Sequence, residues 1–293
     1  MPELPEVEAT RCALQSVMEG ARFQSVVARR PDLRLPLPPH FASRLEGQRV
    51  NSLGRRGKYL VAELSSGDVL LMHLGMSGSF GVTIDGGEQV LGDFYRARGT
   101  AFRHDHIVFE MSSGATITFN DPRRFGFVDL VASHALPSHP ALSALGPEPL
   151  ARDFDAAVLA RACRGKKTSL KAALVDQRVV AGLGNIYVCE ALHRARLSPR
   201  RRASTIATAR GLPRDEAHRL TAAIKRVLRD AITRGTARAG VADDADTESS
   251  DFRHRFRVYD REGACCVTRG CRGIVKRIVQ GRRSTFFCPV CQK

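Results

Sequence analysis

Five of the eight cysteines lie within the last 29 residues, and their spacing is that of a metal site. Four residues separate Cys266 from Cys271, sixteen separate Cys271 from Cys288, and two separate Cys288 from Cys291. Two short Cys turns on either side of a hairpin-sized segment can form a tetrahedral site of four thiolates. Zn²⁺ is the ion that such a site usually binds. We therefore predict one structural zinc ion, bound by Cys266, Cys271, Cys288 and Cys291.

Two alternatives remain open for these cysteines. Cys265 directly precedes Cys266, and only one of the two can be the fourth ligand without distorting a tight turn; we favour Cys266. A disulfide pair is disfavoured because we expect a cytosolic protein, in which thiols stay reduced. We expect that location because no apolar run is long enough to cross a bilayer, and because the acidic start is unlike the positively charged start of a signal peptide.

Basic residues outnumber acidic ones, with 46 Lys and Arg against 30 Asp and Glu, so the formal net charge is +16. Such a balance attracts polyanions, and nucleic acid is the first candidate. Five of the cations lie between the two Cys turns, at Arg272, Lys276, Arg277, Arg282 and Arg283. A zinc-bound hairpin that carries arginines suits contact with phosphates or a groove, although a solvated basic face would also explain the outermost members.

A second feature that suits phosphate binding lies in the stretch "AGLGNIY". Gly182 and Gly184 precede Asn185, which is a good N-cap for a helix that starts there. Free backbone N–H groups at a helix start bind phosphate, and glycines let the backbone come close. Lys166, Lys167 and Lys171 stand just upstream. Structural packing of two helices is an equally good explanation of this stretch taken alone.

The first eight residues hold two prolines and three carboxylates, at an end where chains usually fray. The residues are Pro2, Glu3, Pro5, Glu6 and Glu8. An amphipathic helix follows, because apolar positions recur at helical spacing from Val7 to Met18 and Gly20 is placed to end it. Negative charge at a helix start is favourable, but it does not explain the prolines.

The elements that must position these groups fall into distinct stretches. Residues 21–131 alternate as strands, and "YLVAELSSGDVLLMHLG" and "HIVFEMSSGATITFN" each predict a hairpin around a Ser-Ser-Gly turn. Residues 136–150 are rich in proline and suit a linker, whereas residues 151–235 show helical periodicity that Gly235 should end. The polar, acidic segment from 236 to 251 predicts a loop.

Taken together, these features make the whole chain resemble the formamidopyrimidine-DNA glycosylase family, to which endonuclease VIII also belongs. Six motifs carry the resemblance, in the family's order: "PELPEVE", "GRRGKYL", "HLGMSG", "NDPRRFG", "AGLGNIY" and the four-Cys finger. The resemblance implies excision of oxidised purines, such as 8-oxoguanine and formamidopyrimidines, from double-stranded DNA. Cleavage at the resulting abasic site, by β- and δ-elimination, would follow.

The resemblance also implies a role for the proline-rich start. Removal of the initiator methionine would leave the secondary amine of Pro2 as the nucleophile, and an α-amino group is partly unprotonated near neutral pH. Glu3 would be the general acid/base, Glu6 would orient the N-terminus, and Glu8 has the weakest claim to a role. Lys58 would donate a proton and contact phosphate.

Other roles follow from the same motifs. Arg283 would assist δ-elimination and grip a phosphate, with Arg282 as its close competitor. Flipping a nucleotide leaves a hole in the duplex, which Met76, Arg123 and Phe125 would fill. Contacts with the DNA backbone would come from His104, Arg124, Lys166 and Asn185.

The resemblance implies an α+β protein in several domains. Residues 1–135 would form a β-rich catalytic domain, an antiparallel β-sandwich or barrel with flanking helices, and 136–150 the linker. Residues 151–251 would form a helical helix-two-turn-helix DNA-binding domain that includes the loop 236–251 over the lesion, and 252–293 the zinc-binding β-hairpin. The protein would act as a monomer in the cytoplasm, on DNA.

Two departures from the family pattern and two rival functions accompany this reading. The first Cys turn has four intervening residues where two are more usual, and the segment 236–250 differs from the usual loop, which leaves the lesion preference open. A non-catalytic lesion sensor would not need Pro2, Glu3 or Lys58. The endonuclease VIII branch, which acts on oxidised pyrimidines, is disfavoured by "PELPEVE" and by Phe125.

Overall fold

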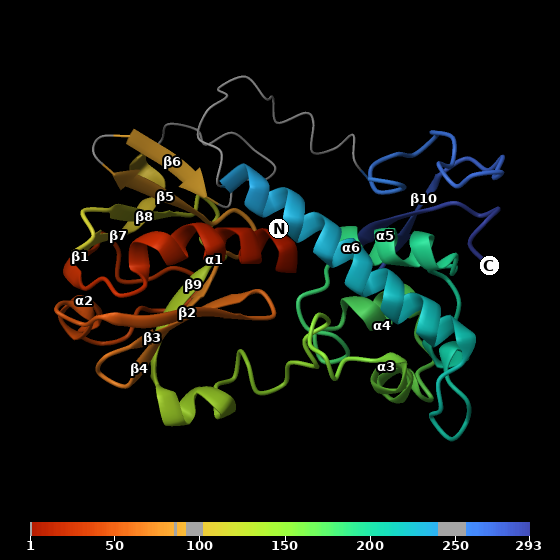
Figure 1. The fold of residues 1–293 in the computed structure, drawn as a ribbon, viewed down its shortest axis with the longest axis horizontal. Coiled ribbons are helices and arrows are strands. Elements are labelled where there is room, and N and C mark those ends of the chain that lie inside the picture. The colour runs from red at the N-terminus through yellow and green to blue at the C-terminus, as the bar shows by residue number, and fades with distance from the viewer. Residues whose placement is uncertain (1, 85–86, 92–101, 240–255) are drawn as a thin grey trace. The chain divides into compact units, whose positions relative to one another are not determined.

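The computed structural model describes residues 2–84, 87–91, 102–239 and 256–293 (Figure 1). Its contacts divide the chain into two compact units. The first comprises Met1–Ser143 and Ile232–Ser249, and the second comprises Ala144–Ala231 and Ser250–Lys293. The division therefore falls between Ser143 and Ala144, which lies inside the stretch that we interpreted as a linker.

Helix α1 (Leu4–Met18) opens the first unit. It ends near Gly20 as predicted, but it begins at Leu4 and not at Val7, so most of the acidic start belongs to the helix. Glu3 is its N-cap and forms a capping box with Glu6, which satisfies backbone N–H groups that would otherwise lack partners. Pro5 fits the first turn because no N–H is needed there. The helix buries the apolar face that the spacing predicts, including Leu14 and Met18.

Two antiparallel sheets form the body of the first unit. The five-stranded sheet has the order β1 (Phe23–Ala28), β7 (Asp105–Met111), β8 (Thr116–Asn120), β5 (Ser79–Ile84) and β6 (Gly87–Leu91). The four-stranded sheet has the order β2 (Val50–Arg56), β3 (Tyr59–Leu64), β4 (Asp68–His73) and β9 (Phe127–Ala132). Strands β3 and β4, and strands β7 and β8, pair as the two predicted hairpins.

One hydrophobic core joins the sheets and α1. It contains Leu14 from α1, Leu60 and Met72 from the smaller sheet, and Phe23 and Phe109 from the larger one. The prediction left a sandwich or a barrel open, and the structure shows two antiparallel sheets that share one core, as in a sandwich. The short helix α2 (Phe41–Leu45) lies within the range that we expected to be strands; its two ends are buried one helical turn apart. Two 3₁₀ segments, η1 (Phe102–His104) and η2 (Ser133–Ser138), complete this part.

Helices dominate the second unit, as predicted. They are α3 (Ala156–Cys163), α4 (Leu170–Val175), α5 (Asn185–Ala195), the 3₁₀ segment η3 (Ala203–Ile206) and α6 (Asp215–Ala239), whose residues from Ile232 onward belong to the first unit. No helix in the described part of the chain is both long and apolar enough to cross a membrane.

The structure corrects the predicted end of α6. The helix continues through Gly235 to Ala239, so residues 236–239 are helical and do not belong to a loop. Gly235 acts here through its small size: a Cβ on it would lie 3.2 Å from the Cβ of Ala9. The glycine lets α6 pack closely against α1, and this tertiary contact outweighs its poor helix propensity. The remaining loop residues, 240–251, lie outside the described residues.

The C-terminal finger belongs to the same compact unit as the helices. Its strands β10 (Lys276–Gln280) and β11 (Arg283–Phe287) pair as an antiparallel hairpin. A small core joins Cys189 of α5 to Val258, Val275 and Phe286. The buried carboxylate of Glu190, also on α5, accepts hydrogen bonds from the backbone N–H groups of residues 257, 258 and 259. The finger is thus anchored to α5.

Candidate functional site

The proline-rich start is held in place at the N-terminus of α1. Pro2 is buried, and Glu3 and Glu6 are 2% and 1% exposed. The backbone N–H of Glu3 donates a hydrogen bond of 2.8 Å to Oε2 of Glu6. Because Glu6 is itself fixed in the first helical turn, the residue that follows Pro2 has a defined position and the segment does not fray.

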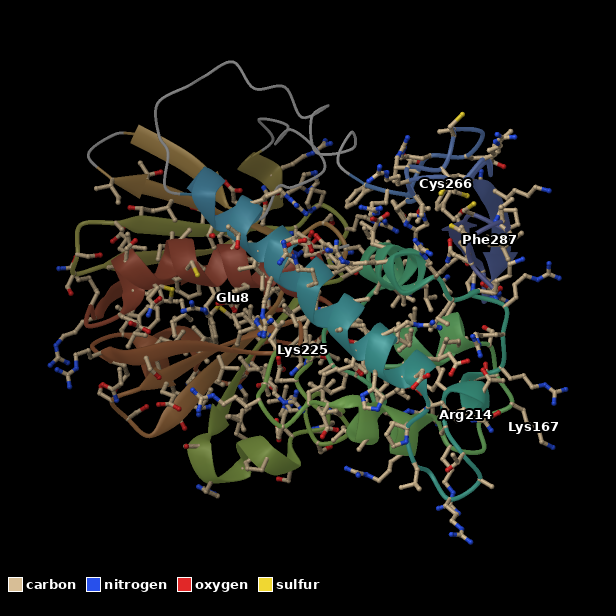
Figure 2. The ribbon with its side chains drawn as sticks, turned by 45° about the vertical axis from the view of Figure 1, so that its right-hand side comes forward. Glu8, Lys167, Arg214, Lys225, Cys266 and Phe287 are labelled. Carbon is tan, nitrogen blue, oxygen red and sulfur yellow. The ribbon has the colours of Figure 1, made fainter. Side chains whose placement is uncertain are left out.

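Lys58 lies in the tight turn between β2 and β3, and it is 7% exposed. Arg55 connects this turn to α1: its Nη1 donates to the carbonyl of Gly57 at 2.9 Å, and its Nε donates to Oε2 of Glu8 at 2.7 Å. Figure 2 shows Glu8 on the α1 ribbon. Sequence reasoning assigned Glu8 the least role, and it did not identify Arg55 as the residue that joins the two motifs.

Glu8 remains a carboxylate in this position. Burial raises its pKa, but the hydrogen bonds and positive charges of Arg55 and Arg11 outweigh burial and hold the pKa below its ordinary value. Arg11 contacts the other carboxylate oxygen at 2.8 Å. The negative charge of Glu8 is therefore shared between two guanidinium groups, as expected for an ion pair that is largely removed from water.

The loops that carry Met76 and Phe125 are in direct contact. A Cβ on Gly75 would lie 2.3 Å from the backbone N of Gly126 and 2.3 Å from the carbonyl carbon of Phe125, and Gly75 has a φ of +62°. Only glycine has no Cβ to clash with this neighbouring backbone and also adopts a positive φ without strain. Met76 and Phe125 are each 42% exposed, so both side chains are available for an outside partner.

Asp121 organises these two loops, although sequence reasoning did not single it out. Its carboxylate is fully buried and accepts hydrogen bonds from Oγ of Ser77 at 2.5 Å and from the backbone N–H of Gly126 at 2.7 Å. The guanidinium of Arg123 lies 4.9 Å from the centre of the Phe125 ring. The structure therefore brings together the three residues predicted to fill the duplex, Met76, Arg123 and Phe125.

His73 is a further residue that sequence reasoning missed. Its Nδ1 accepts the backbone N–H of Gly75 at 3.0 Å, so the ring helps to place the Met76 loop. Burial, together with the positive charges of Lys58 and Arg34, lowers the pKa of His73 to about 4. The imidazole is neutral near pH 7. The position of this histidine in "HLGMSG" was the available signal.

The residues predicted to contact the DNA backbone have different surroundings. His104, in η1, accepts a hydrogen bond at Nε2 from Nε of Arg103 at 3.1 Å, and its carbonyl accepts the backbone N–H of Asp121. Arg124 is exposed, adopts a φ of +54°, and lies 3.8 Å from a carboxylate oxygen of Asp32. His104 therefore contacts the residue that precedes the loop of Arg123 and Phe125, and Arg124 is part of that loop.

In the second unit, the structure corrects the start of α5. Gly184 is the N-cap in extended conformation, and Asn185 is the first helical residue. The Nδ2 group of Asn185 instead donates to the carbonyl of Ser284, on β11 of the finger, at 2.9 Å. Gln177 holds the preceding loop, because it accepts the N–H of Gly182 and donates to the carbonyl of Leu183.

This hydrogen bond links α5 to the strand that carries Arg283. Arg283 is exposed at the first position of β11, and its competitor Arg282 is exposed in the turn with a φ of +60°. Lys166 is partly exposed and follows α3. Asn185, Lys166 and Arg283 thus all belong to the second unit.

The cysteine cluster has the geometry of a zinc site. The Sγ atoms of Cys266, Cys271, Cys288 and Cys291 lie within 4.8 Å of one another, with closest pairs at 3.6 and 3.7 Å. Zn–S bonds of about 2.3 Å place tetrahedral sulfurs about 3.8 Å apart, and a disulfide would need about 2.05 Å. The four cysteines therefore fit a structural zinc ion.

The same geometry separates Cys266 from Cys265. Cys265 pairs with Ile274 in an isolated β-bridge and is exposed, so the two neighbouring side chains point in different directions. Burial and the neighbouring sulfurs raise the pKa of Cys291, because thiolates held close together repel one another. A divalent cation would relieve this conflict among crowded thiols.

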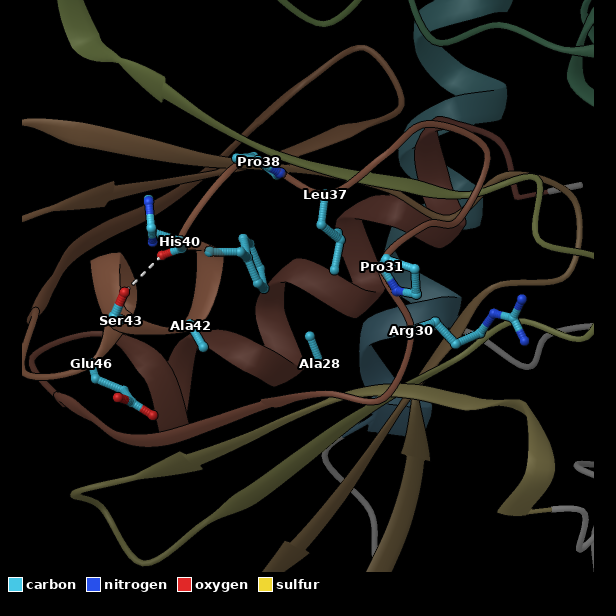
Figure 3. A pocket seen from close by; sticks show the side chains of 10 residues that line it. Ala28, Arg30, Pro31, Leu37, Pro38, His40, Ala42, Ser43 and Glu46 are labelled. Carbon is cyan, nitrogen blue, oxygen red and sulfur yellow. Dashed lines mark hydrogen bonds between the residues drawn. The ribbon is translucent and has the colours of Figure 1, made fainter.

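A surface pocket of about 570 Å³ lies elsewhere in the first unit (Figure 3). It contains none of the predicted site residues. Glu46, at its edge, accepts the backbone N–H of Val26, and Ser43 donates to the carbonyl of His40. These polar groups maintain the local fold. The remaining lining residues are Ala28, Arg30, Pro31, Leu37, Pro38, Phe41 and Ala42.

Comparison with known proteins identifies the family. Residues 1–128 match the family model of the formamidopyrimidine-DNA glycosylase N-terminal domain, and residues 145–242 match that of the formamidopyrimidine-DNA glycosylase H2TH domain. The formamidopyrimidine-DNA glycosylases of Bradyrhizobium diazoefficiens and Rhodopseudomonas palustris strain HaA2 are 59% and 60% identical to the chain, with full coverage of both partners.

Solved structures agree with this assignment. The Lactococcus lactis formamidopyrimidine-DNA glycosylase, bound non-covalently to DNA that contains an abasic site, has a TM-score of 0.79 and 28% identity, with 99% of each chain covered. The MutM (Fpg) protein of Thermus thermophilus has a TM-score of 0.78 and 36% identity, covering 99% of this chain and 98% of that one. The chain is a member of the formamidopyrimidine-DNA glycosylase family.

Proposed function

We propose that the protein is a base-excision-repair DNA glycosylase with abasic-site lyase activity. Its substrate is double-stranded DNA that contains 8-oxoguanine, formamidopyrimidines or abasic sites. The observation that carries the proposal is the fixed start of the chain, where Pro2 is buried and Glu6 accepts the N–H of Glu3 at 2.8 Å. In a member of this family, such a start positions an N-terminal amine for attack on a sugar.

The reaction begins with the secondary amine of Pro2, once the initiator methionine has been removed. The nitrogen attacks C1′ of the damaged nucleotide, a C1′–N bond forms, and the glycosidic bond breaks. Glu3 supplies a proton to help the base leave and later moves protons on the sugar. The C1′–O4′ bond then breaks as O4′ takes up a proton, which opens the sugar ring and leaves an iminium at C1′. The iminium accepts electrons when a proton is lost from C2′, and this allows β-elimination of the 3′ phosphate.

Lys58 assists the first step of this reaction, and Arg283 assists the last. Lys58 contributes a positive charge and a proton beside the reacting sugar, and the bridge from Glu8 through Arg55 to Gly57 supports its position. Arg283 binds the flanking phosphate and favours the second, δ-elimination step. Glu6 orients the N-terminus through its hydrogen bond with the N–H of Glu3.

Extrusion of the damaged nucleotide is the role of the paired loops. Met76, Arg123 and Phe125 enter the duplex and occupy the space of the flipped base. The buried carboxylate of Asp121 supports this, because it keeps both loops in one arrangement. Backbone phosphates are bound by His104, Arg124, Lys166 and Asn185.

The zinc ion stabilises the finger and supplies no chemistry to the reaction. Cys266, Cys271, Cys288 and Cys291 bind it, and the hairpin between the two Cys turns presents Arg283. The protein acts as a monomer in the cytoplasm, where its DNA substrate lies.

Borohydride trapping tests this mechanism directly. Reduction of the iminium at Pro2 should link the protein covalently to a duplex with 8-oxoguanine opposite cytosine, and also to an abasic duplex. Pro2→Gly should lose most base excision but should still bind the duplex. Absence of a covalent product on both duplexes would favour the non-catalytic lesion sensor instead.

Mass spectrometry of the active enzyme gives an independent check. The intact mass should correspond to a chain that begins at Pro2. Full activity in a preparation that retains the initiator methionine would contradict the role of the amine. A panel of oxidised purines and pyrimidines would then rank the lesions and separate this assignment from the endonuclease VIII branch.

A further inference from the structure

Two short segments of the second unit carry an unusual concentration of positive charge. Residues 161–167 read "RACRGKK" and residues 200–214 read "RRRASTIATARGLPR". Together they contain nine Lys and Arg and no Asp or Glu. Of these residues, only Lys166 belongs to the proposed DNA contacts.

The fold brings the two segments together. The backbone N–H of residue 203 donates to the carbonyl of Thr168 at 2.9 Å, and that of residue 204 donates to the carbonyl of Lys166 at 3.1 Å. The turn that follows η3 also reaches α3, since a Cβ on Gly211 would lie 3.2 Å from Cδ of Arg164. Residues about forty positions apart therefore form one continuous surface.

Seven cations of the two segments are exposed. We define six of them, leaving out Arg200 at the start of the second segment, as the basic surface: Arg161, Arg164, Lys167, Arg202, Arg210 and Arg214. Within the described residues, none of the six has a carboxylate oxygen at ion-pair distance. Two nearby acids have other partners: Glu216 pairs with Arg201 at 3.3 Å, and Asp155 caps α3 through the N–H of Val158, although the charge of Arg161 also acts on Asp155. Figure 2 shows Lys167 and Arg214 among these side chains.

Like charges that have no carboxylate at ion-pair distance repel one another, and this repulsion disfavours the compact state. A polyanion relieves that repulsion, and regularly spaced phosphates suit arginines that are fixed on a rigid backbone. The surface is also continuous with Lys166, whose carbonyl takes part in the pairing of the two segments. These observations favour a nucleic-acid backbone as the ligand.

We propose that the basic surface is an additional contact for duplex DNA, which binds backbone phosphates beyond those around the lesion. The choice of DNA as the ligand rests on the proposed function. The surface reads no sequence, because exposed arginines on phosphates give affinity without base contacts. It increases the affinity of the enzyme for long and undamaged duplexes and does not take part in chemistry.

The salt dependence of binding gives the quantitative test. Each phosphate contact adds about 0.9 to the slope of log K against log salt concentration. The double variant Arg202→Gln/Arg210→Gln should therefore lower the slope for a long undamaged duplex by about 1.8 if both side chains bind phosphate. Single-turnover excision from a saturated lesion duplex should remain at the wild-type rate.

A matched control separates a local contact from the general effect of charge. Arg22→Gln/Arg49→Gln removes two exposed arginines from the first unit, with the same change in net charge. We expect this control to leave the salt slope within experimental error of wild type. A circular-dichroism spectrum and the zinc content of each variant confirm that the fold is retained.

The outcomes distinguish this inference from the proposed function. A lower slope in the basic-surface variant alone supports the inference, even in a protein that excises no base. Equal slopes for wild type and the basic-surface variant overturn it, even in a protein with full glycosylase activity. Equal losses in the two double variants also overturn it, because they would reflect net charge and not a contact surface.

Discussion

Replacing Arg55 with glutamine should show how strongly the turn of Lys58 is held against α1. The side chain of Arg55 is 10% exposed, and it contacts Oε2 of Glu8 at 2.7 Å and the carbonyl of Gly57 at 2.9 Å. The change removes a charged donor from a carboxylate that is only 19% exposed. Arg11 remains as the second partner of Glu8.

The expected loss is about 2 kcal/mol of unfolding free energy near pH 7. A hydrogen bond to a charged group is worth about 1.5–3 kcal/mol, and loss of one partner of a fully buried ion pair costs about 3–5 kcal/mol. The range for a single charged hydrogen bond applies here, because Arg11 still neutralises Glu8 in the variant. Arg55→Lys should lose less, since it keeps the charge but not the two-pronged geometry.

The loss should also depend on pH in a defined direction. The folded-state pKa of Glu8 lies below its ordinary value of 4.5, so the carboxylate stabilises the fold above pH 4.5. That stabilisation disappears as pH falls through the folded-state pKa. The difference between wild type and Arg55→Gln should therefore be largest near neutral pH and should shrink in acid below pH 4.5.

Urea denaturation at neutral and acidic pH measures this, and Arg178→Gln is the control. Arg178 pairs with Asp176 at 2.8 Å but is 74% exposed, so its loss should have little effect. Excision by Arg55→Gln should slow while lesion-duplex binding persists, because the turn of Lys58 is displaced. The reasoning is refuted if Arg55→Gln is no more destabilising than Arg178→Gln.

Three further predictions concern the finger and the paired loops. Cys288→Ser should lose the single equivalent of zinc that Cys265→Ser retains, as measured by atomic absorption; loss in both would point to unfolding. Gly75→Ala should slow excision and should destabilise the fold by more than Gly67→Ala. Both positions have a positive φ, which costs ~1–2 kcal/mol for alanine, but only at Gly75 would the new Cβ also clash with neighbouring backbone. His73 should make stability fall as pH drops from its ordinary 6.5 towards 4, because only the unfolded chain takes up the proton; an unchanged pH dependence in His73→Gln would contradict this.

Much of the fold follows from local patterns in the chain. The two Ser-Ser-Gly turns between alternating apolar runs were enough to predict both hairpins, because strand alternation and turn chemistry are properties of neighbouring residues. The helix after the acidic start was predictable for the same reason. The end of α6 was not predictable, because the helical conformation at Gly235 depends on its contact with Ala9, which lies far away in the chain.

The candidate site, too, could be predicted only in part from the sequence. The chemical types and spacing of the four cysteines indicate zinc, and the six motifs indicate the family. Which of Cys265 and Cys266 joins the cluster depends on the β-bridge to Ile274, and the partner of Asn185 depends on where β11 packs. Such choices need the finger to be folded against α5.

Residue identity along the chain was sufficient for the metal, for the charge that attracts DNA and for the order of the elements, because each depends on side-chain chemistry or short-range periodicity. The bridge from Glu8 through Arg55 to Gly57, the carboxylate of Asp121 between two loops and the joining of two basic segments were settled only in three dimensions. Each joins residues far apart in the chain, and only packing brings such residues within hydrogen-bond or van der Waals distance.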